Sequence, residues 1–278
     1  MSDMYVGQLE EALFEAFPAA DAESWDKPGL CVGDADAVVG KVAVNLDMTA
    51  QAVISAAEAG CNVLVTHHPP FIKECPALFT PQWQGTASGP GRMVYEAASR
   101  GVNVIAMHTN ADRAIRTREV IANMLGFSCD GCFEFLMDPS RPLQGTGFGA
   151  LLTCPQPVTL RALSQRCYDA FGGSPRVWGD ANAKIKRAAF LNGSWGEQEV
   201  YDVCIASGID CIMVGESRYH FCVDAQPHLA VIDLGHDRSE LHIEQVLAEA
   251  VEAAGVPVAN IKRLKCSANN WWTPLAER

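Results

Sequence analysis

A strand, helix, strand pattern near the N-terminus does most to restrict the folds open to this chain. Residues 42–47 form an apolar run typical of a strand, residues 50–59 are rich in alanine and typical of a helix, and residues 61–66 are again apolar and partly β-branched. Two strands joined by a helix run parallel, with a right-handed crossover. The sequence therefore predicts an α/β fold built on parallel strands.

Two histidines and two prolines follow the second of these strands. His67 and His68 stand directly before Pro69 and Pro70, and the prolines can continue neither a helix nor a sheet ladder. Side chains alternate along a strand, but at its end, where the chain turns, both imidazoles can face one cleft. Imidazole is the commonest protein ligand for transition metals, so the pair is a candidate metal site. From these residues alone, two ordinary surface histidines are the alternative.

The same pattern returns in the second half of the chain. Residues 186–191 and 209–214 are typical of strands, with helical residues between them, and the second strand ends in Gly215-Glu216. We interpret this as a divergent internal duplication. The predicted fold is α/β, with two similar, intertwined lobes over residues 1–127 and 128–278 and a metal site in the cleft between them. The C-terminal helix, predicted from Ser239 to Ala254, is expected to close this site.

Further candidate metal ligands lie at the ends of later strands. Open α/β sheets bind their ligands at the carboxyl ends of the strands. Asp112 follows the predicted strand at 102–107, and His236 and Glu240 follow the strand at 228–234. If a helix begins near His236, the spacing of four residues places His236 and Glu240 on one face.

Together these positions give five candidate ligands: His67, His68, Asp112, His236 and Glu240. Mixed imidazoles and carboxylates suit Zn, Fe, Mn, Co or Ni better than Ca or Mg alone. Five ligands exceed what one open catalytic site needs, which predicts two divalent transition-metal ions about 3.5–4 Å apart.

Other polar residues near the strand ends are candidates for supporting roles. Proton transfer, or hydrogen bonds that orient the ligands, could come from Glu216, His108 and His220. Ordinary polar residues at strand ends are the alternative. Three arginines could hold a triphosphate, although a solvated helix face is the favoured interpretation: Arg113, Arg116 and Arg118.

Charge and composition exclude several classes of protein. The net charge of −12 argues against a nucleic-acid surface. No run of 18 apolar residues is present, and the first residues lack the features of a signal peptide, so we expect a soluble, cytoplasmic protein without a membrane partner. The eleven cysteines are expected to be reduced. Cys129 and Cys132 form one C-x-x-C without a second pair, so buried thiols are favoured over a redox or metal role.

Four motifs occur in order along nearly the whole chain. They are Thr66-His67-His68-Pro69, His108-Thr109-Asn110-Ala111-Asp112, Val214-Gly215-Glu216 with His220, and Gly235-His236 with Glu240. As a set they resemble the Nif-three-like family, whose members are called type 2 GTP cyclohydrolase I homologues or dinuclear-metal-centre hexameric proteins. Trp25-Asp26, Gly29-Leu30, Gly33 and Leu46-Asp47 add to the resemblance. By composition alone, Trp25 is expected to cap the core from a surface loop.

The resemblance implies a site, an assembly and a reaction. The same five ligands would hold two metals, with Glu240 as the bridge, in a toroidal homohexamer whose sites face an internal cavity. The implied reaction is the ring-opening hydrolysis of GTP to dihydroneopterin triphosphate. The preferred hypothesis is a metal-dependent hydrolase acting on GTP or a related nucleotide or pterin. The alternative is a non-enzymatic metal-binding scaffold or regulatory ring protein.

Overall fold

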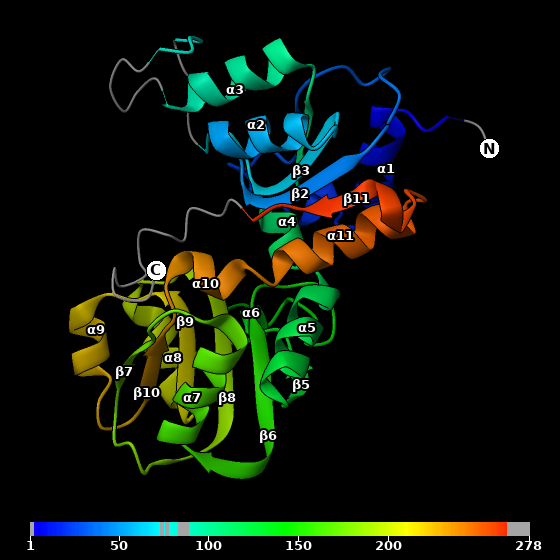
Figure 1. The fold of residues 1–278 in the computed structure, drawn as a ribbon. Helices are drawn as coiled ribbons and strands as arrows, with labels where there is room; N and C mark the ends of the chain where they lie inside the picture. The colour runs from blue at the N-terminus through cyan, green and yellow to red at the C-terminus, as the bar shows by residue number, and fades with distance from the viewer. Residues whose placement is uncertain (1–2, 73–74, 76–77, 83–88, 266–278) are drawn as a thin grey trace. The chain divides into compact units, whose positions relative to one another are not determined.

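The computed structural model describes residues 3–72, 75, 78–82 and 89–265, and the chain forms two compact units (Figure 1). Unit 1 runs to Ala111 and also takes in the segment that begins at Ile243. Unit 2 runs from Asp112 to His242. Each unit is built around its own β-sheet.

The sheet of unit 1 has five strands in the order β1-β4-β3-β2-β11. Their bounds are β1 Gly29–Val32, β2 Val42–Asp47, β3 Val63–His68, β4 Asn103–Ala106 and β11 Ile261–Arg263. Strands β2, β3, β4 and β11 run parallel, and β1 pairs antiparallel with β4. Strands β2, β3 and β4 are buried along nearly their whole length, as expected for the central strands of a sheet covered on both faces.

Helices cover both faces of this sheet. They are α1 Val6–Ala16, α2 Ala50–Glu58, α3 Gly89–Arg100 and α11 Ile243–Ala253, with α4 Thr109–Asp112 after β4. Helices α2 and α3 lie on one side of the strands and α11 lies on the other (Figure 1). The side chain of Thr49 accepts a hydrogen bond from Ala52 N, which confirms it as the N-cap of α2.

The sheet of unit 2 has six strands in the order β5-β6-β8-β9-β10-β7. Their bounds are β5 Ser128–Gly131, β6 Ala150–Thr159, β7 Arg176–Trp178, β8 Lys184–Ser194, β9 Cys211–Glu216 and β10 Ala230–Asp233. Strands β8, β9 and β10 run parallel, and the other three pair antiparallel with their neighbours.

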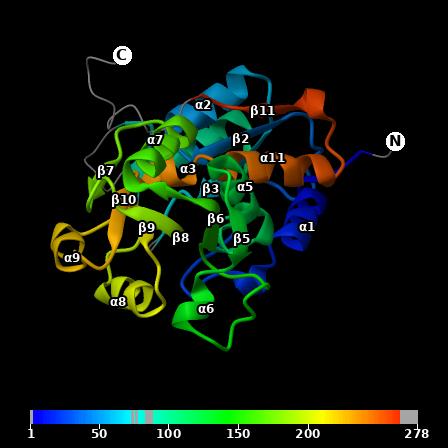
Figure 2. The same ribbon diagram turned by 90° about the horizontal axis from the view of Figure 1, so that it is seen from below.

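Alternating side chains give unit 2 a core on each face of its sheet. Phe190 and Met213 pack on one side, and Leu191 and Val214 pack on the other. The helices are α5 Ile115–Leu125, α6 Glu134–Met137, α7 Leu160–Phe171, α8 Gln198–Ala206, α9 Tyr219–Asp224 and α10 His236–Glu240. Helices α5 and α7 cover the first side, and α6, α8 and α9 cover the second, as Figure 2 shows for α7, α8 and α9.

The two units repeat one topology, which confirms the predicted α/β duplication. In unit 1, β2, β3 and β4 follow one another as parallel neighbours, and β1 pairs antiparallel with β4. In unit 2, β8, β9 and β10 do the same, and β7 pairs antiparallel with β10. In both units the antiparallel strand precedes the parallel three in the sequence.

The assignment of segments to the units differs from the predicted division at residues 127 and 128. The segment 112–127 belongs to unit 2, where α5 packs on α7 and β6. The last helix belongs to unit 1, because β11 pairs with β2 and Glu244 Oε1 accepts a hydrogen bond from Leu46 N at 3.0 Å. The first predicted lobe therefore gives α5 to unit 2, and the second gives α11 and β11 to unit 1, which makes the lobes intertwined. A sequence pattern shows that a helix is apolar on one face, but not which sheet that face covers.

Two smaller expectations also change, and a third is not tested. The predicted helix 239–254 is broken into α10 and α11, and residues 128–145, predicted as a connection, contain β5 and α6. Trp271-Trp272, expected to pack on a lobe or another subunit, lies outside the described residues. Within the described part of the chain, no helix has both the length and the apolar character needed to cross a membrane.

Replacing Gly33 by Ala should destabilise unit 1 strongly. Gly33 has φ +127°, and a Cβ there would lie 2.9 Å from Asn103 Cα. We expect a loss of about 3 kcal/mol in the free energy of unfolding, measured by chemical denaturation. The control is Gly101→Ala, where φ is +66° but nothing lies within 4 Å of the added Cβ, so the loss should be about 1 kcal/mol. Equal losses would contradict the close approach of Gly33 to β4.

Candidate metal centre

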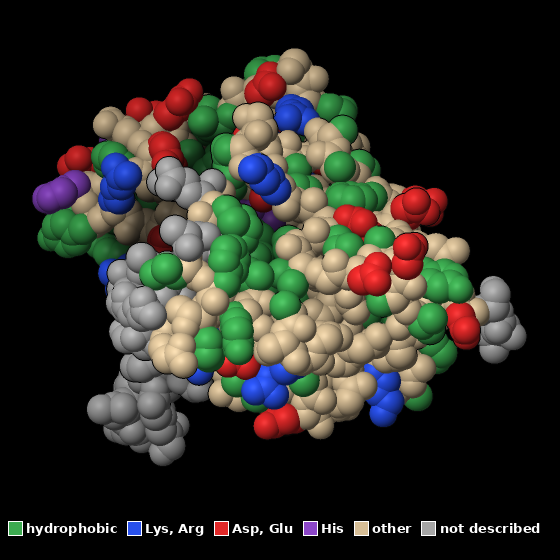
Figure 3. Space-filling model, turned by 90° about the horizontal axis from the view of Figure 1, so that it is seen from above, with side chains coloured by type: hydrophobic (Ala, Val, Ile, Leu, Met, Phe, Trp, Pro, Cys, Tyr) green, Lys and Arg blue, Asp and Glu red, His purple; other side chains and the backbone are tan. Residues whose placement is uncertain are grey.

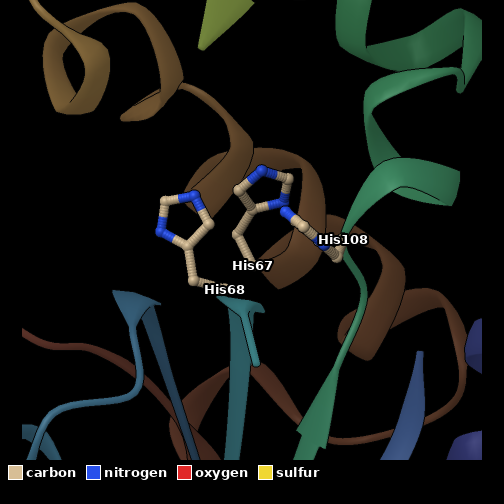
Figure 4. A group of neighbouring side chains, drawn as sticks. All are labelled: His67, His68 and His108. Carbon is tan, nitrogen blue, oxygen red and sulfur yellow. The ribbon is translucent and has the colours of Figure 1, made fainter. Parts of the chain in front are cut away.

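Three imidazoles gather at the carboxyl ends of two neighbouring strands of unit 1 (Figure 4). His67 and His68 end β3, and His108 follows β4. The ring centroid of His67 lies 4.8 Å from that of His68 and 5.2 Å from that of His108. One ring nitrogen from each of the three lies within 4.8 Å of the others, which is close enough to share an ion. We call these three residues the histidine cluster.

Each ring of the histidine cluster is held through its Nδ1 atom. His67 Nδ1 lies 3.0 Å from the carbonyl oxygen of Met107, which can only accept, so Nδ1 carries the proton. His68 Nδ1 lies 2.7 Å from Asp47 Oδ1. His108 Nδ1 lies 3.1 Å from Asp26 Oδ1. In the neutral rings these contacts leave the lone pair on Nε2, the arrangement found in histidines that bind metals.

Asp26 is the anchor of a turn that lies against His108. Its side chain is only 2% exposed. Burial opposes ionisation, but the hydrogen bond and charge of His108, with two hydrogen bonds from Thr109, hold the pKa of Asp26 well below its usual range. The neighbouring Trp25 does not cap the core as expected: its ring is 50% exposed and meets His108 edge to face at 5.8 Å.

A second group of candidate ligands lies in unit 2, around the end of β8. Asp112 and Glu240 are buried. Asn192 Nδ2 donates to Asp112 Oδ1 at 2.5 Å, and His236 Nε2 lies 3.3 Å from Glu240 Oε2, so the predicted helical pair does share a face. We call Asp112, His236 and Glu240 the carboxylate cluster. One imidazole and two carboxylates are suitable donors for a divalent transition metal.

Gly193 makes room for the carboxylate cluster. Its φ is +73°, and a Cβ at this position would lie 2.7 Å from Glu240 Oε1 and 3.7 Å from His236 Nε2. Only a residue without a side chain allows the β8 backbone to come this close to both ligands. Neither Gly193 nor Asn192 was predicted as a site residue, because glycine and asparagine are not usual ligands of transition metals.

His236 borders a cavity inside unit 2. The cavity has a volume of about 400 Å³ and is lined by the end of β9, the end of β10 with the start of α10, and the turn before β7. Glu216 lies on its wall, with a side chain 53% exposed and Oε2 3.4 Å from His236 Nδ1. Arg176 and Arg238 also line it. Glu216 therefore lies beside the candidate ligand His236, and its role in proton transfer or in orienting a ligand stays a prediction.

The buried Asp233 holds the wall of this cavity together. One of its oxygens accepts hydrogen bonds from Ser217 N and Oγ at 3.1 and 2.7 Å and from Arg176 Nη2 at 2.6 Å. Its other oxygen accepts from Gly235 N at 3.1 Å. These bonds join the ends of β9, β10 and β7, so the cavity has a defined shape.

The remaining candidates are placed differently. His220 is exposed on α9, where its ring meets that of Tyr219 at 5.4 Å, and no described contact joins it to Glu216 or His236. His242, which the sequence analysis did not single out, is buried two residues after Glu240. Burial lowers the pKa of His242 to about 4, against the opposing charge of Glu240, so its ring is neutral at pH 7.

The arginines proposed to hold a triphosphate are mostly structural. Arg113 is 4% exposed, pairs with Glu134 at 2.9 Å and stacks 4.0 Å from the ring centre of Phe148. Arg118 is 3% exposed and donates to the carbonyl oxygens of Gly145 and Gln144. Neither the triphosphate nor the solvated-face interpretation fits these two. Arg116 is on the surface beside Glu119.

Cys129 and Cys132 are free thiols. Cys129 packs against the core of unit 2, and its Sγ contacts the carbonyl oxygen of Gly131. Cys132 is buried and its Sγ contacts the carbonyl oxygen of Pro142. These separate contacts agree with the structural role that the sequence analysis favoured.

Comparison with known proteins places the chain in a family. The model of Duf34/NIF3 (NGG1p interacting factor 3) matches residues 4–268. A protein of Clostridium acetobutylicum named GTP cyclohydrolase 1 type 2 homolog is 31% identical over 240 residues, 85% of each chain. A solved Staphylococcus aureus protein has a TM-score of 0.80 at 22% identity, covering 96% of this chain and 98% of its own. A Bacillus cereus protein related to NIF3 has a TM-score of 0.79 at 17% identity, covering 97% and 99%. These matches confirm the resemblance read from the motifs, and the chain belongs to the Duf34/NIF3 family.

Proposed function

We propose that this protein is a metal-dependent hydrolase that acts on GTP or on a related nucleotide or pterin, and that opens the imidazole ring when the substrate is GTP. Its cofactor would be two divalent transition-metal ions, held by His67, His68, Asp112, His236 and Glu240. The name of the Clostridium acetobutylicum relative agrees with this substrate class. When bound, such ions lower the pKa of water and stabilise negative charge that develops on the substrate.

The cavity beside His236 is the observation that carries the proposal. A structural or storage site closes its metal within protein ligands, whereas a catalytic site keeps a position open to a substrate. His236 has a side chain 37% exposed and lines a cavity of about 400 Å³, within the usual size range of small-molecule sites. A ligand at this position is therefore accessible to a small molecule.

The chain's own residues have separable roles in this proposal. Asp47 and Asp26 orient His68 and His108, so that the same nitrogen of each ring is presented. We assign His108 as a sixth candidate ligand beside these five, rather than as a proton-transfer group, because its Nδ1 is held by Asp26 and its ring belongs to the histidine cluster. Glu216 is the residue best placed to accept or return a proton, since it is exposed on the cavity wall.

Surface charge agrees with a small substrate. On the face drawn in Figure 3, the Lys and Arg side chains lie apart from one another, among acidic and apolar side chains. With a net charge of −12, a continuous basic surface for a nucleic acid is disfavoured. The proposed assembly is a homohexamer, which the family resemblance suggests.

Replacing Glu240 by Gln should reduce the metal content. The amide keeps the shape of the side chain but loses the charge that a bridging ligand needs, so we expect about one metal fewer per chain. Elemental analysis of the purified protein measures this. The matched control is Glu96→Gln, a buried carboxylate that pairs with Arg100 on α3. Full metal occupancy in the Glu240 variant would contradict its assignment as a ligand.

Replacing Asp47 by Ala should weaken metal binding without removing a ligand. His68 would lose the carboxylate that fixes its Nδ1, and we expect the dissociation constant to rise about 10- to 100-fold. Competition with a chromophoric chelator measures the constant. Asp36→Ala, at an exposed position outside the site, is the control and should bind metal like the natural protein.

Incubation with GTP tests the reaction itself. The protein loaded in turn with Zn, Fe, Mn, Co or Ni should convert GTP to a pterin, detected by its fluorescence after oxidation. Glu216→Gln should lower kcat by about 10²- to 10⁴-fold while keeping the metals, as expected for a group that transfers a proton. Absence of any pterin with all five metals would reject this substrate and favour the non-enzymatic scaffold or regulatory role.

A further inference from the structure

Trp25 is an exposed aromatic ring beside the histidine cluster. Of the tryptophans that the structure describes, Trp25 alone is exposed, at 50%, while Trp178 and Trp195 are partly covered. Its ring centre lies 5.8 Å from that of His108, with an angle of 69° between the rings. An indole this exposed leaves a large part of its apolar surface in water and forgoes the stabilisation that burial would give. Packing of unit 1 therefore does not explain its position.

The turn that carries Trp25 is fixed firmly in place. Asp26 accepts hydrogen bonds from Thr109 N at 3.0 Å and from Thr109 Oγ1 at 2.6 Å, and it also holds His108. Glu23 N donates to Thr109 Oγ1 at 2.9 Å. The buried carboxylate thus ties one side of the turn to the segment after β4. The indole is exposed without being loosely held, which is the arrangement of a preformed contact surface.

We propose that Trp25 is the stacking platform for the planar ring of the nucleotide or pterin that reaches the histidine cluster. The choice of ligand rests on the function proposed above. An indole offers a flat, uncharged surface on which any purine or pterin ring can stack. The same turn carries Glu23 and Asp26 against one cation, Lys27. It therefore suits the neutral ring of such a ligand and not its phosphates.

Calorimetric titration of the full-length protein with two probes tests this role. Guanosine carries the ring without phosphates, and inorganic tripolyphosphate carries the phosphates without the ring. Trp25→Ala should weaken guanosine binding about ten-fold and leave tripolyphosphate binding unchanged. Trp25→Phe, which keeps a planar ring, should restore guanosine binding to within about three-fold. Tyr168→Ala, at a 48% exposed aromatic on α7, is the matched control and should change neither.

Other outcomes would overturn the proposal. Guanosine binding that is absent from the natural protein, or that Trp25→Ala does not affect, would contradict it. So would equal weakening of guanosine and tripolyphosphate binding in the variant. A change in the oligomeric state of the Trp25→Ala variant would contradict it as well. The last would mark Trp25 as an interface residue. The result is independent of turnover: a protein that binds guanosine through Trp25 but forms no pterin would retain the platform and lose the proposed reaction.

Discussion

The hydrogen bonds to Nδ1 of three histidines are the interaction on which the chemistry of unit 1 depends. Neutral imidazole can present the lone pair of either ring nitrogen to a metal. Which nitrogen a histidine at a strand end presents is therefore undetermined until the other nitrogen is held by a hydrogen bond. Here Nδ1 is the nitrogen that is held in all three rings, and its partners are the Met107 carbonyl, Asp47 and Asp26. The acceptors come from three separate segments. Asp47 and Met107 reach their rings because β2, β3 and β4 are parallel neighbours, and Asp26 reaches His108 from the turn before β1, which pairs with β4. The fold thus determines which atoms the cluster offers.

The exchange of segments between the units bears on the same strand ends. Helix α11 comes from the end of the chain, yet Glu244 on it accepts a hydrogen bond from Leu46 N, directly before Asp47. Burial raises the pKa of Glu244, although Arg263, on the exchanged strand β11, opposes this at 3.4 Å. Protonation of Glu244 would remove its charge, but its side chain would stay in the same place. The C-terminal segment therefore helps to fix the end of β2, from which Asp47 reaches His68.

The sequence could predict those features whose signal lies in neighbouring residues of the chain. Apolar periodicity and strand-end polar residues are local, so the parallel strands, the duplication and residues such as His67 and His236 could be found directly. The partners of a buried charge are not local: Arg113 finds Glu134 and Phe148, which no pattern around Arg113 indicates. The exchange of α11 was missed for the same reason. Trp25 shows a third case, because composition favours burial for tryptophan, whereas this one is exposed on a turn that Asp26 anchors.

The candidate ligands differ in exposure, and this difference bears on the choice between the proposed hydrolase and a storage protein. His67 is completely buried, and Asp112 and Glu240 are 8% and 3% exposed, so a metal on these atoms would be shielded by protein. The side chain of His236 is 37% exposed, and its neighbour Glu216 is more exposed still. A storage site gains from enclosing every ligand, because each open position weakens retention. One accessible ligand beside a shaped cavity, with a carboxylate on the cavity wall, is instead what a hydrolytic site requires.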